Sequence, residues 1–268
     1  MDAIKALRKR VLELLYFAGD GNVQSTFSVI DILWVLYDQI LGLTPDNCKN
    51  PDRNYFVLSK GQATPGLLAV LENKGFLDSN EMDGIGTFDS RFSFQADRTK
   101  IREPVETSGG SLGHGLPMAV GIALAGKITG SPSKVYALVG DGELNEGTMW
   151  ESVLLAGHKK LDNLHIIVDD NNSIGKMIDM GDLGAKLGAF GLKVLYVNGH
   201  DHVQIKDALK TVPENQPLAT IAKTVRGYGS KTLMEDNSWF HRAPNKDELR
   251  TLCEEVDNFA ESDVSDNK

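Results

Sequence analysis

Two polar segments of the chain carry residue types that could hold a divalent cation. Gly140-Asp141-Gly142-Glu143 directly follows the apolar run 135–139, and Asp169-Asp170-Asn171-Asn172 directly follows the apolar run 164–168. Carboxylate and carboxamide oxygens are hard donors suited to Mg²⁺ or Ca²⁺. The glycines on both sides of Asp141 let the backbone turn tightly and approach a ligand closely. A cation held in this way could bridge two phosphate groups.

The spacing of these two segments favours a shared site. Asp141 and Asn171 lie 30 positions apart (171 − 141), which is the length of one helix plus one strand. They would therefore belong to adjacent strand–helix–strand units, whose strands end at the same edge of a parallel sheet. A Gly-Asp-Gly sequence alone also occurs in ordinary turns that end a strand. The paired asparagines after the next strand favour a ligand site over such a turn.

The elements that must position these residues alternate between strands and helices. The helical spacing of apolar residues predicts helices over 4–15, 29–37, 67–75, 117–127, 148–161 and 203–209. Short β-rich runs predict strands over 55–59, 135–139, 164–168, 194–197 and 218–222. This order predicts an α/β fold in which helices sandwich a parallel sheet, as one domain over 1–253. The polar and acidic stretch 254–268 is predicted to be a fraying tail.

The composition excludes several classes of partner. A net charge of -9 argues against a nucleic-acid or anionic-membrane partner. The two cysteines, Cys48 and Cys253, lie far apart and lack a CxxC spacing, so neither a disulfide framework nor a thiolate metal site is indicated. No apolar run approaches the ~18 residues that span a bilayer, and no signal-peptide core is present. We therefore expect a cytoplasmic protein with small-molecule ligands.

Several motifs resemble those of one enzyme family. They are Gly140 to Gly147 with Trp150-Glu151 and His158 to Leu164, then Ser108 to Gly115, Leu58-Ser59-Lys60-Gly61, and Ser28 to Leu33. Over nearly its whole length the chain resembles the transketolases, and in particular the separately encoded N-terminal, diphosphate-binding subunits of split transketolases. In this family the interval from Asp141 to Asn171 is the thiamin diphosphate signature. The resemblance implies the thiamin-diphosphate-binding fold. It also implies transfer of a two-carbon ketol unit from a ketose-type donor to an aldehyde acceptor, in carbohydrate metabolism.

The resemblance also implies roles for individual residues. Asp141, Asn171 and the backbone carbonyl of Ser173 would coordinate Mg²⁺ or Ca²⁺, and the N–H of Gly142 would face the diphosphate. The other implied contacts to thiamin diphosphate are Gly110, Ser111, Leu112, Gly140, Glu143, Gln62 and His241. Glu146 and Glu151 match acidic residues that lie at the subunit contact and link paired active sites in the family. Their alternative interpretation is a solvated pair stabilised by the N-terminus of a helix.

The chain departs from the family at its active-site histidines. Asn22, Gln62 and Gln95 stand where three of them are expected, and the fourth position falls on His241 in one register and on Phe240 in another. Amides donate and accept hydrogen bonds but do not titrate near neutrality. We predict that Asn22, Gln62, Gln95 and His241 contribute to a catalytic site for a non-standard substrate. The alternative is a degenerate, non-catalytic cofactor-binding subunit.

A partner polypeptide follows from the same resemblance. The glutamate that protonates the aminopyrimidine ring belongs to a second domain in the family, so we expect a separately encoded C-terminal, pyrimidine-binding subunit and a heterotetramer. A component of a thiamin-dependent 2-oxoacid decarboxylase or acyl-transfer enzyme would share the metal ligands. The segments 58–61 and 108–115 favour the transketolase branch over that alternative.

Overall fold

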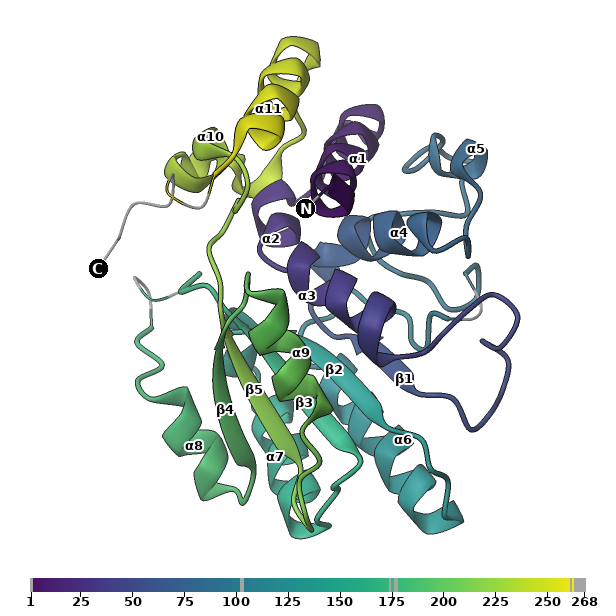
Figure 1. The fold of residues 1–268 in the computed structure, drawn as a ribbon, viewed down its shortest axis with the longest axis vertical. Helices are drawn as coiled ribbons and strands as arrows, with labels where there is room; N and C mark the ends of the chain where they lie inside the picture. The colour runs from purple at the N-terminus through teal and green to yellow at the C-terminus, as the bar shows by residue number, and fades with distance from the viewer. Residues whose placement is uncertain (1, 102–103, 174, 176–177, 261, 263–268) are drawn as a thin grey trace.

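Five parallel strands form the centre of the protein (Figure 1). The structure is a computed structural model and describes residues 2–101, 104–173, 175, 178–260 and 262. The strands are β1 (Tyr55–Leu58), β2 (Val135–Gly140), β3 (Leu164–Asp170), β4 (Lys193–Asn198) and β5 (Leu218–Lys223), and their order in the sheet is β1-β2-β3-β5-β4. All neighbouring strands pair in parallel. The predicted α/β fold with a parallel sheet is confirmed.

Helices cover both faces of the sheet. On β2, Val135, Ala137 and Val139 pack toward one layer, whereas Tyr136 and Leu138 pack toward the other. The first layer contains α6 (Gly115–Thr129), α7 (Gly147–His158) and α8 (Leu183–Ala189), and the second contains α1 (Asp2–Ala18), α3 (Ile30–Val35), α4 (Thr64–Asn73) and α9 (His202–Lys210). Figure 1 shows α9 in front of the strands and α7 behind them. The strands β1, β2, β3 and β5 are mostly apolar because both of their faces are largely buried, whereas the edge strand β4 is partly exposed.

Shorter elements complete the chain. The other α-helices of the described ranges are α2 (Val23–Phe27), α5 (Ser79–Met82), α10 (Lys231–Glu235) and α11 (Lys246–Asn258). Helix α3 continues into a π-helical turn, η1 (Leu36–Ile40). The 3₁₀ turns of these ranges are η2 (Gly61–Ala63), η3 (Gly142–Asn145) and η4 (Asn237–His241). Within the described ranges, no helix is long and apolar enough to cross a lipid bilayer.

Helix α11 corrects the predicted tail. The helix begins with a capping box, in which the Asn245 side chain accepts bonds from the first turn and the Glu248 side chain accepts one from the Asn245 N–H at 2.8 Å. Only Leu252 and Val256 are buried along its length, which is too few for a clear helical pattern in the sequence. Residues 254–258 therefore belong to the helix and, through Val256, to the core. They do not form a fraying tail.

The strand register brings the two polar segments to one edge of the sheet. Gly140 at the end of β2 aligns with Asp169 on β3, and the Asp141 N–H donates to the Asp169 carbonyl at 3.1 Å. On the other side of β3, Asp170 aligns with Lys223 at the end of β5. The loops that follow β2, β3 and β5 therefore lie at the same carboxyl edge.

Candidate functional site

Asp141 begins the turn between β2 and α7 and is buried, with 4% of its surface exposed. Its carboxylate accepts three hydrogen bonds, from the Gly142 N–H at 2.7 Å, the Ser173 N–H at 2.9 Å and the Ser173 hydroxyl at 2.6 Å. These bonds join the loop after β2 to the loop after β3. They also hold the carboxylate in one orientation, as a metal ligand requires.

The same bonds bear on the implied roles of Gly142 and Ser173. The N–H of Gly142 faces the Asp141 carboxylate, so this donor would exchange its partner if it met a phosphate oxygen. Ser173 meets Asp141 through its N–H and hydroxyl, which places Ser173 beside the carboxylate. Coordination by the Ser173 carbonyl stays a prediction.

Asn171 lies in the loop after β3, and its side-chain oxygen has no partner within the described residues. Its Nδ2 donates to Asp169 Oδ2 at 2.8 Å, which fixes the amide and leaves Oδ1 as its free end. In the described part of the chain, Oδ1 is buried and has no hydrogen-bond partner. A buried polar atom without a partner costs roughly 1–3 kcal/mol, and a bound cation would supply the missing interaction. Asp141 and Asn171 therefore fit a hard cation.

The predicted ligand set is not a cluster of acidic side chains. Among residues 2–101, 104–173, 175, 178–260 and 262, no group of three or more His, Cys, Asp or Glu side chains could hold a metal ion. The set implied for this site is one carboxylate, one amide oxygen and one carbonyl, which are ligands typical of Mg²⁺ and Ca²⁺ when water and phosphate complete the coordination.

Asp169 positions Asn171 and is itself fixed by several segments. Asp169 is fully buried and pairs with Lys60, which is 2% exposed. The Ser28 hydroxyl donates to Asp169 at 2.9 Å, and the Thr224 hydroxyl donates to its other carboxylate oxygen. A buried ion pair needs such additional bonds to offset its desolvation. The pairing of Asp169 with Lys60 does not follow from the sequence, although Lys60 directly follows the first predicted strand.

Glu143 joins the segment 108–115, here called the glycine loop, to the loop after β2. Its Oε1 accepts from the Ser59 hydroxyl at 2.5 Å and the Gly113 N–H at 2.8 Å, and its Oε2 accepts from the Gly140 N–H at 3.2 Å. Burial raises the pKa of Glu143, and the three hydrogen bonds oppose that rise. The Glu143 carboxylate is thus engaged by the protein itself, so its predicted contribution to cofactor binding is to position the glycine loop.

The glycine loop packs against Gln95. Gly110 and Gly113 have φ values of 125° and 83°, a region that favours glycine. A Cβ added at Gly61 would lie 2.2 Å from Gln95 Oε1, and one at Gly110 would lie 3.4 Å from Gln95 Cγ. Gln95 Oε1 is buried and lacks a hydrogen-bond partner in the part of the chain that the structure describes. Ser111-Leu112, by contrast, is exposed.

The structure brings Asn22 and His241 together. Asn22 Nδ2 lies 3.4 Å from His241 Nε2. Phe240, the other candidate for the fourth histidine position, lies under Arg226, whose Cζ is 5.1 Å from the ring centre. Gln62 lies in η2, directly after the segment 58–61. Both candidates for the fourth position therefore lie near the carboxyl edge.

Glu146 ends the short turn η3 that Asp141 begins, and Glu151 lies on α7. Both are exposed and belong to the beginning of α7, where Glu146 is the N-cap residue. The Glu146 side chain packs on the glycine loop, since a Cβ added at Gly113 would lie 2.6 Å from Glu146 Cβ. Their exposure is compatible with a contact to a second polypeptide and with a solvated pair at a helix N-terminus.

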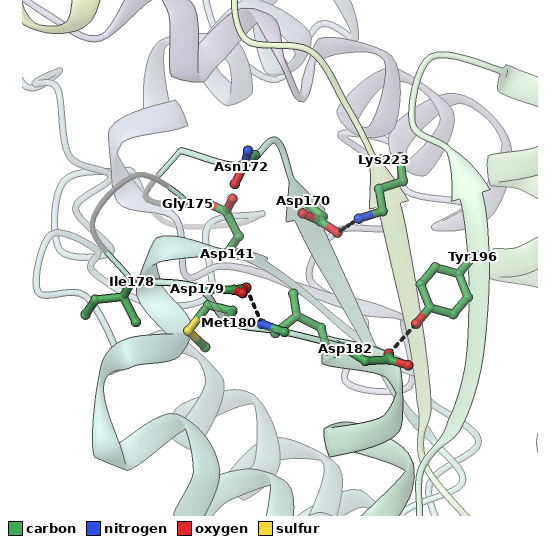
Figure 2. Close-up of a pocket in the computed structure, with 12 residues that line it drawn as sticks. Asp141, Asp170, Asn172, Gly175, Ile178, Asp179, Met180, Asp182, Tyr196 and Lys223 are labelled. Carbon is green, nitrogen blue, oxygen red and sulfur yellow. Dashed lines mark hydrogen bonds and ion pairs between the residues drawn. The ribbon is translucent and has the colours of Figure 1, made fainter. Parts of the chain in front are cut away.

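Two cavities open at this edge. Figure 2 shows the first, of about 500 Å³, with Asp141 in its wall and Lys223 paired with Asp170. The second, of about 370 Å³, runs along the glycine loop and is lined by Ser111 and His114. The predicted metal ligand and the predicted cofactor loop therefore face open space at the same edge of the sheet.

This arrangement is typical of α/β proteins that bind a phosphorylated cofactor beyond the carboxyl ends of parallel strands. Residues 1–257 match the family described as transketolase, thiamine diphosphate binding domain. The chain belongs to the transketolase family and comprises its thiamine diphosphate binding domain.

Similar proteins include both separate subunits and whole transketolases. The chain is 34% identical over 261 residues to one of the subunits of the apulose-4-phosphate transketolase of Actinobacillus succinogenes, covering 94% of each chain. It is 31% identical over 231 residues to one of the subunits of a 6-deoxy-6-sulfo-D-fructose transketolase of Clostridium, covering 84% of each. Against human transketolase it is 33% identical over 262 residues, which are 95% of this chain and 41% of the human protein.

Solved structures agree with this relationship. The transketolase of Campylobacter jejuni superposes with a TM-score of 0.86 at 26% identity, over 96% of this chain and 43% of that one. The chain therefore spans the length of the subunit-type relatives and less than half of the undivided enzyme.

Proposed function

We propose that the chain is the N-terminal subunit of a two-subunit, thiamin-diphosphate-dependent transketolase-like transferase that acts in the cytoplasm. Two observations carry the proposal: Asp141 is bonded to Ser173 in the loop after β3, and Asn171 in the same loop has a buried oxygen without a partner among the described residues. We infer that Asp141 and Asn171 would contribute to a cation site in this thiamine diphosphate binding domain. The match to separately encoded transketolase subunits over most of their length supports the two-subunit organisation.

The residues of this chain would hold and orient the cofactor. Asp141, Asn171 and the Ser173 carbonyl would bind Mg²⁺ or Ca²⁺. The N–H of Gly142 would meet the diphosphate, and the glycine loop with Leu112 would line the thiazolium and aminopyrimidine rings. When bound, thiamin diphosphate supplies a carbon nucleophile for ketol transfer.

The amides at the histidine positions support a non-standard substrate. Gln95 keeps an unused buried acceptor, and Asn22 lies within 3.4 Å of His241. The amides can read hydroxyls but cannot transfer protons near neutral pH. Two relatives are named for apulose 4-phosphate and for 6-deoxy-6-sulfo-D-fructose, which are sugars with an anionic group. We infer a ketose-type donor that differs from ordinary ketose phosphates in hydroxyl pattern or terminal group.

The proposed partner is a separately encoded C-terminal subunit with the aminopyrimidine-protonating glutamate, in a heterotetramer. Exposed Glu146 and Glu151 on α7 would lie at that contact. An interface of this obligate kind would bury more than about 2,000 Å².

Calorimetric titration tests the proposal. Thiamin diphosphate with Mg²⁺ should bind to the chain reconstituted with its partner, and ketol transfer from a ketose-type donor to an aldehyde should follow. Binding without transfer would favour the non-catalytic alternative, and release of CO₂ from a 2-oxoacid would favour the decarboxylase alternative.

A further inference from the structure

The loop after β5 carries a cation to which the proposed function assigns no role. Arg226 follows β5, which pairs with β3. It therefore belongs to the same carboxyl edge as Asp141 and Asn171, which follow β2 and β3. Arg226 is half-buried. Thr224, two residues earlier in the same loop, donates its hydroxyl to Asp169 and its N–H to the Asp170 carbonyl at 3.2 Å, so this loop starts beside the loop that carries Asn171.

A buried glutamine holds Arg226 in place. The Gln24 side chain is 1% exposed, and its Nε2 donates to the carbonyls of Leu233 at 2.5 Å and Asp236 at 3.0 Å. Both amide hydrogens of Gln24 are used in this way, which fixes the direction of its oxygen. Gln24 Oε1 accepts a hydrogen bond from Arg226 Nη2 at 2.8 Å. The neighbouring Gly227 N–H also donates to the Gln24 carbonyl at 3.1 Å. The loop and the arginine are therefore fixed to α2 at two points.

The Arg226 guanidinium is only partly satisfied. One face lies over the Phe240 ring, with Cζ 5.1 Å from the ring centre. Arg226 Nε is buried and has no hydrogen-bond partner among the residues that the structure describes. The nearby carboxylates are engaged elsewhere, because Asp141 accepts from Ser173 and Asp169 pairs with Lys60. A fixed guanidinium with a buried, unused N–H is the arrangement that recognises an oxyanion.

We propose that Arg226 is a positioning residue that binds a phosphate oxygen of the cofactor diphosphate, on the side of the metal site away from β2. The inference rests on the proposed function. The bond from Thr224 to Asp169 holds the loop of Arg226 beside the predicted metal ligands, which favours the diphosphate over the distant anionic end of a substrate. A cation at Asp141 would bring the diphosphate to this edge. Gln24 and Phe240 set the position of the guanidinium before the ligand arrives.

The test uses inorganic diphosphate with Mg²⁺ as the probe and calorimetry on the full chain as the readout. Arg226→Met keeps the length of the side chain and removes its charge and donors, and should weaken diphosphate binding about 10- to 100-fold. Arg226→Lys should recover only part of the loss, because an ammonium lacks the planar set of donors. Arg91→Met removes one exposed arginine that is paired with Glu81, and should leave the affinity unchanged.

A second variant covers poor folding of Arg226→Met. Gln24→Met leaves the arginine in place, removes the acceptor that orients it, and should weaken binding by a smaller factor. Unchanged diphosphate affinity in both folded variants would overturn the inference. If Arg226→Met instead raised only the KM for a phosphorylated donor, the anion that Arg226 binds would belong to the substrate. The assignment of Arg226 to the diphosphate would then be wrong. Failure of the unmodified chain to bind diphosphate with Mg²⁺ even when it is reconstituted with its partner would contradict the proposed function as well.

Discussion

At the scale of single residues, the strongest sign of a ligand is the oxygen of Asn171. Asp169 fixes the amide through its nitrogen, so the buried oxygen cannot turn to find a protein donor. Native proteins rarely leave such an atom unpaired. Asp141 differs, because its carboxylate already accepts bonds from Gly142 and Ser173. The two predicted ligands therefore have different structural costs when they are changed.

Replacing either ligand should abolish metal-dependent cofactor binding. Asn171→Ala removes an oxygen that the protein does not use, and should lower thiamin diphosphate affinity by more than about 100-fold, beyond the effect typical of groups around a metal ligand. Asp141→Ala should do the same and also destabilise the fold by about 1–3 kcal/mol, because it strands three donors. Calorimetry with Mg²⁺ and urea unfolding measure the two effects. Asp170→Asn is the control on the same edge, and cofactor affinity unchanged in either ligand variant would refute the site.

Restoring the missing histidines should not create an efficient ordinary transketolase. In the triple variant Asn22→His, Gln62→His and Gln95→His, each imidazole must reach its substrate atom within about 2.6–3.2 Å. Gln95 lies so close to Gly61 that a Cβ there would be 2.2 Å from Gln95 Oε1, so a branched, rigid imidazole ring at position 95 would be displaced. Steady-state kinetics on xylulose 5-phosphate and ribose 5-phosphate decide the matter. A parent enzyme with kcat/KM above ~10⁴ M⁻¹s⁻¹ on this pair would contradict the altered-substrate hypothesis.

At the scale of elements, β3 connects stability to the site. It is the central strand between β2 and β5, and it ends in the loop that carries Asn171. Near its other end, His165 is 1% exposed and lies edge-on to Tyr136, with ring centres 4.9 Å apart. Both of its ring nitrogens are without hydrogen-bond partners in the described ranges. Burial lowers the pKa of His165 to about 3.

This histidine should make the fold sensitive to acid. The unfolded chain takes up a proton on this ring near pH 6.5, whereas the folded chain does so only near pH 3. Between these values the unfolded state binds more protons, so stability falls as the pH falls. The expected loss from pH 7 to pH 5 is about 2 kcal/mol from this residue, at 1.36 kcal/mol per pKa unit. Urea unfolding of His165→Phe at both pH values should show a loss smaller by that amount, whereas exposed His158→Gln should behave like the parent.

The strands could be predicted from the sequence because buried parallel strands are continuous apolar runs. The helices α8 and α11 could not, since α8 is rich in glycine and alanine and α11 buries only two side chains. The proximity of Asp141 to the loop of Asn171 followed from the parallel register alone. The bonds from Lys60 to Asp169 and from Arg226 to Gln24 join positions 109 and 202 residues apart. Such pairs depend on side-chain directions that a sequence pattern does not contain.

At the scale of the whole molecule, the chain matches 94% of a separately encoded transketolase subunit and 41% of the undivided human enzyme. The carboxyl edge is open in this chain, with Leu112 38% exposed in the loop predicted to line the cofactor rings. A second polypeptide that covers this edge would exclude water from the cofactor.

The purified chain should therefore have no ketol-transfer activity on its own. Activity should appear only when the proposed partner is added, and it should saturate at a fixed ratio of the two chains. A coupled assay of ketol transfer during titration with the partner measures both. Turnover by the single chain, with the partner shown to be absent by mass spectrometry, would refute the two-subunit proposal.

The buried pair of Lys60 and Asp169 limits how the sequence can drift. Removing one member strands a charge in the core, at a cost of about 3–5 kcal/mol, which is a large part of the roughly 5–15 kcal/mol that stabilises a typical domain. A neutral pair of similar volume would avoid that cost, so the two positions should change together or not at all. Asp169 also orients Asn171, so a relative in which the pair is exchanged would need another group to orient the predicted metal ligand. Cofactor binding would therefore constrain substitutions at Lys60 and Asp169, although neither residue is a predicted ligand.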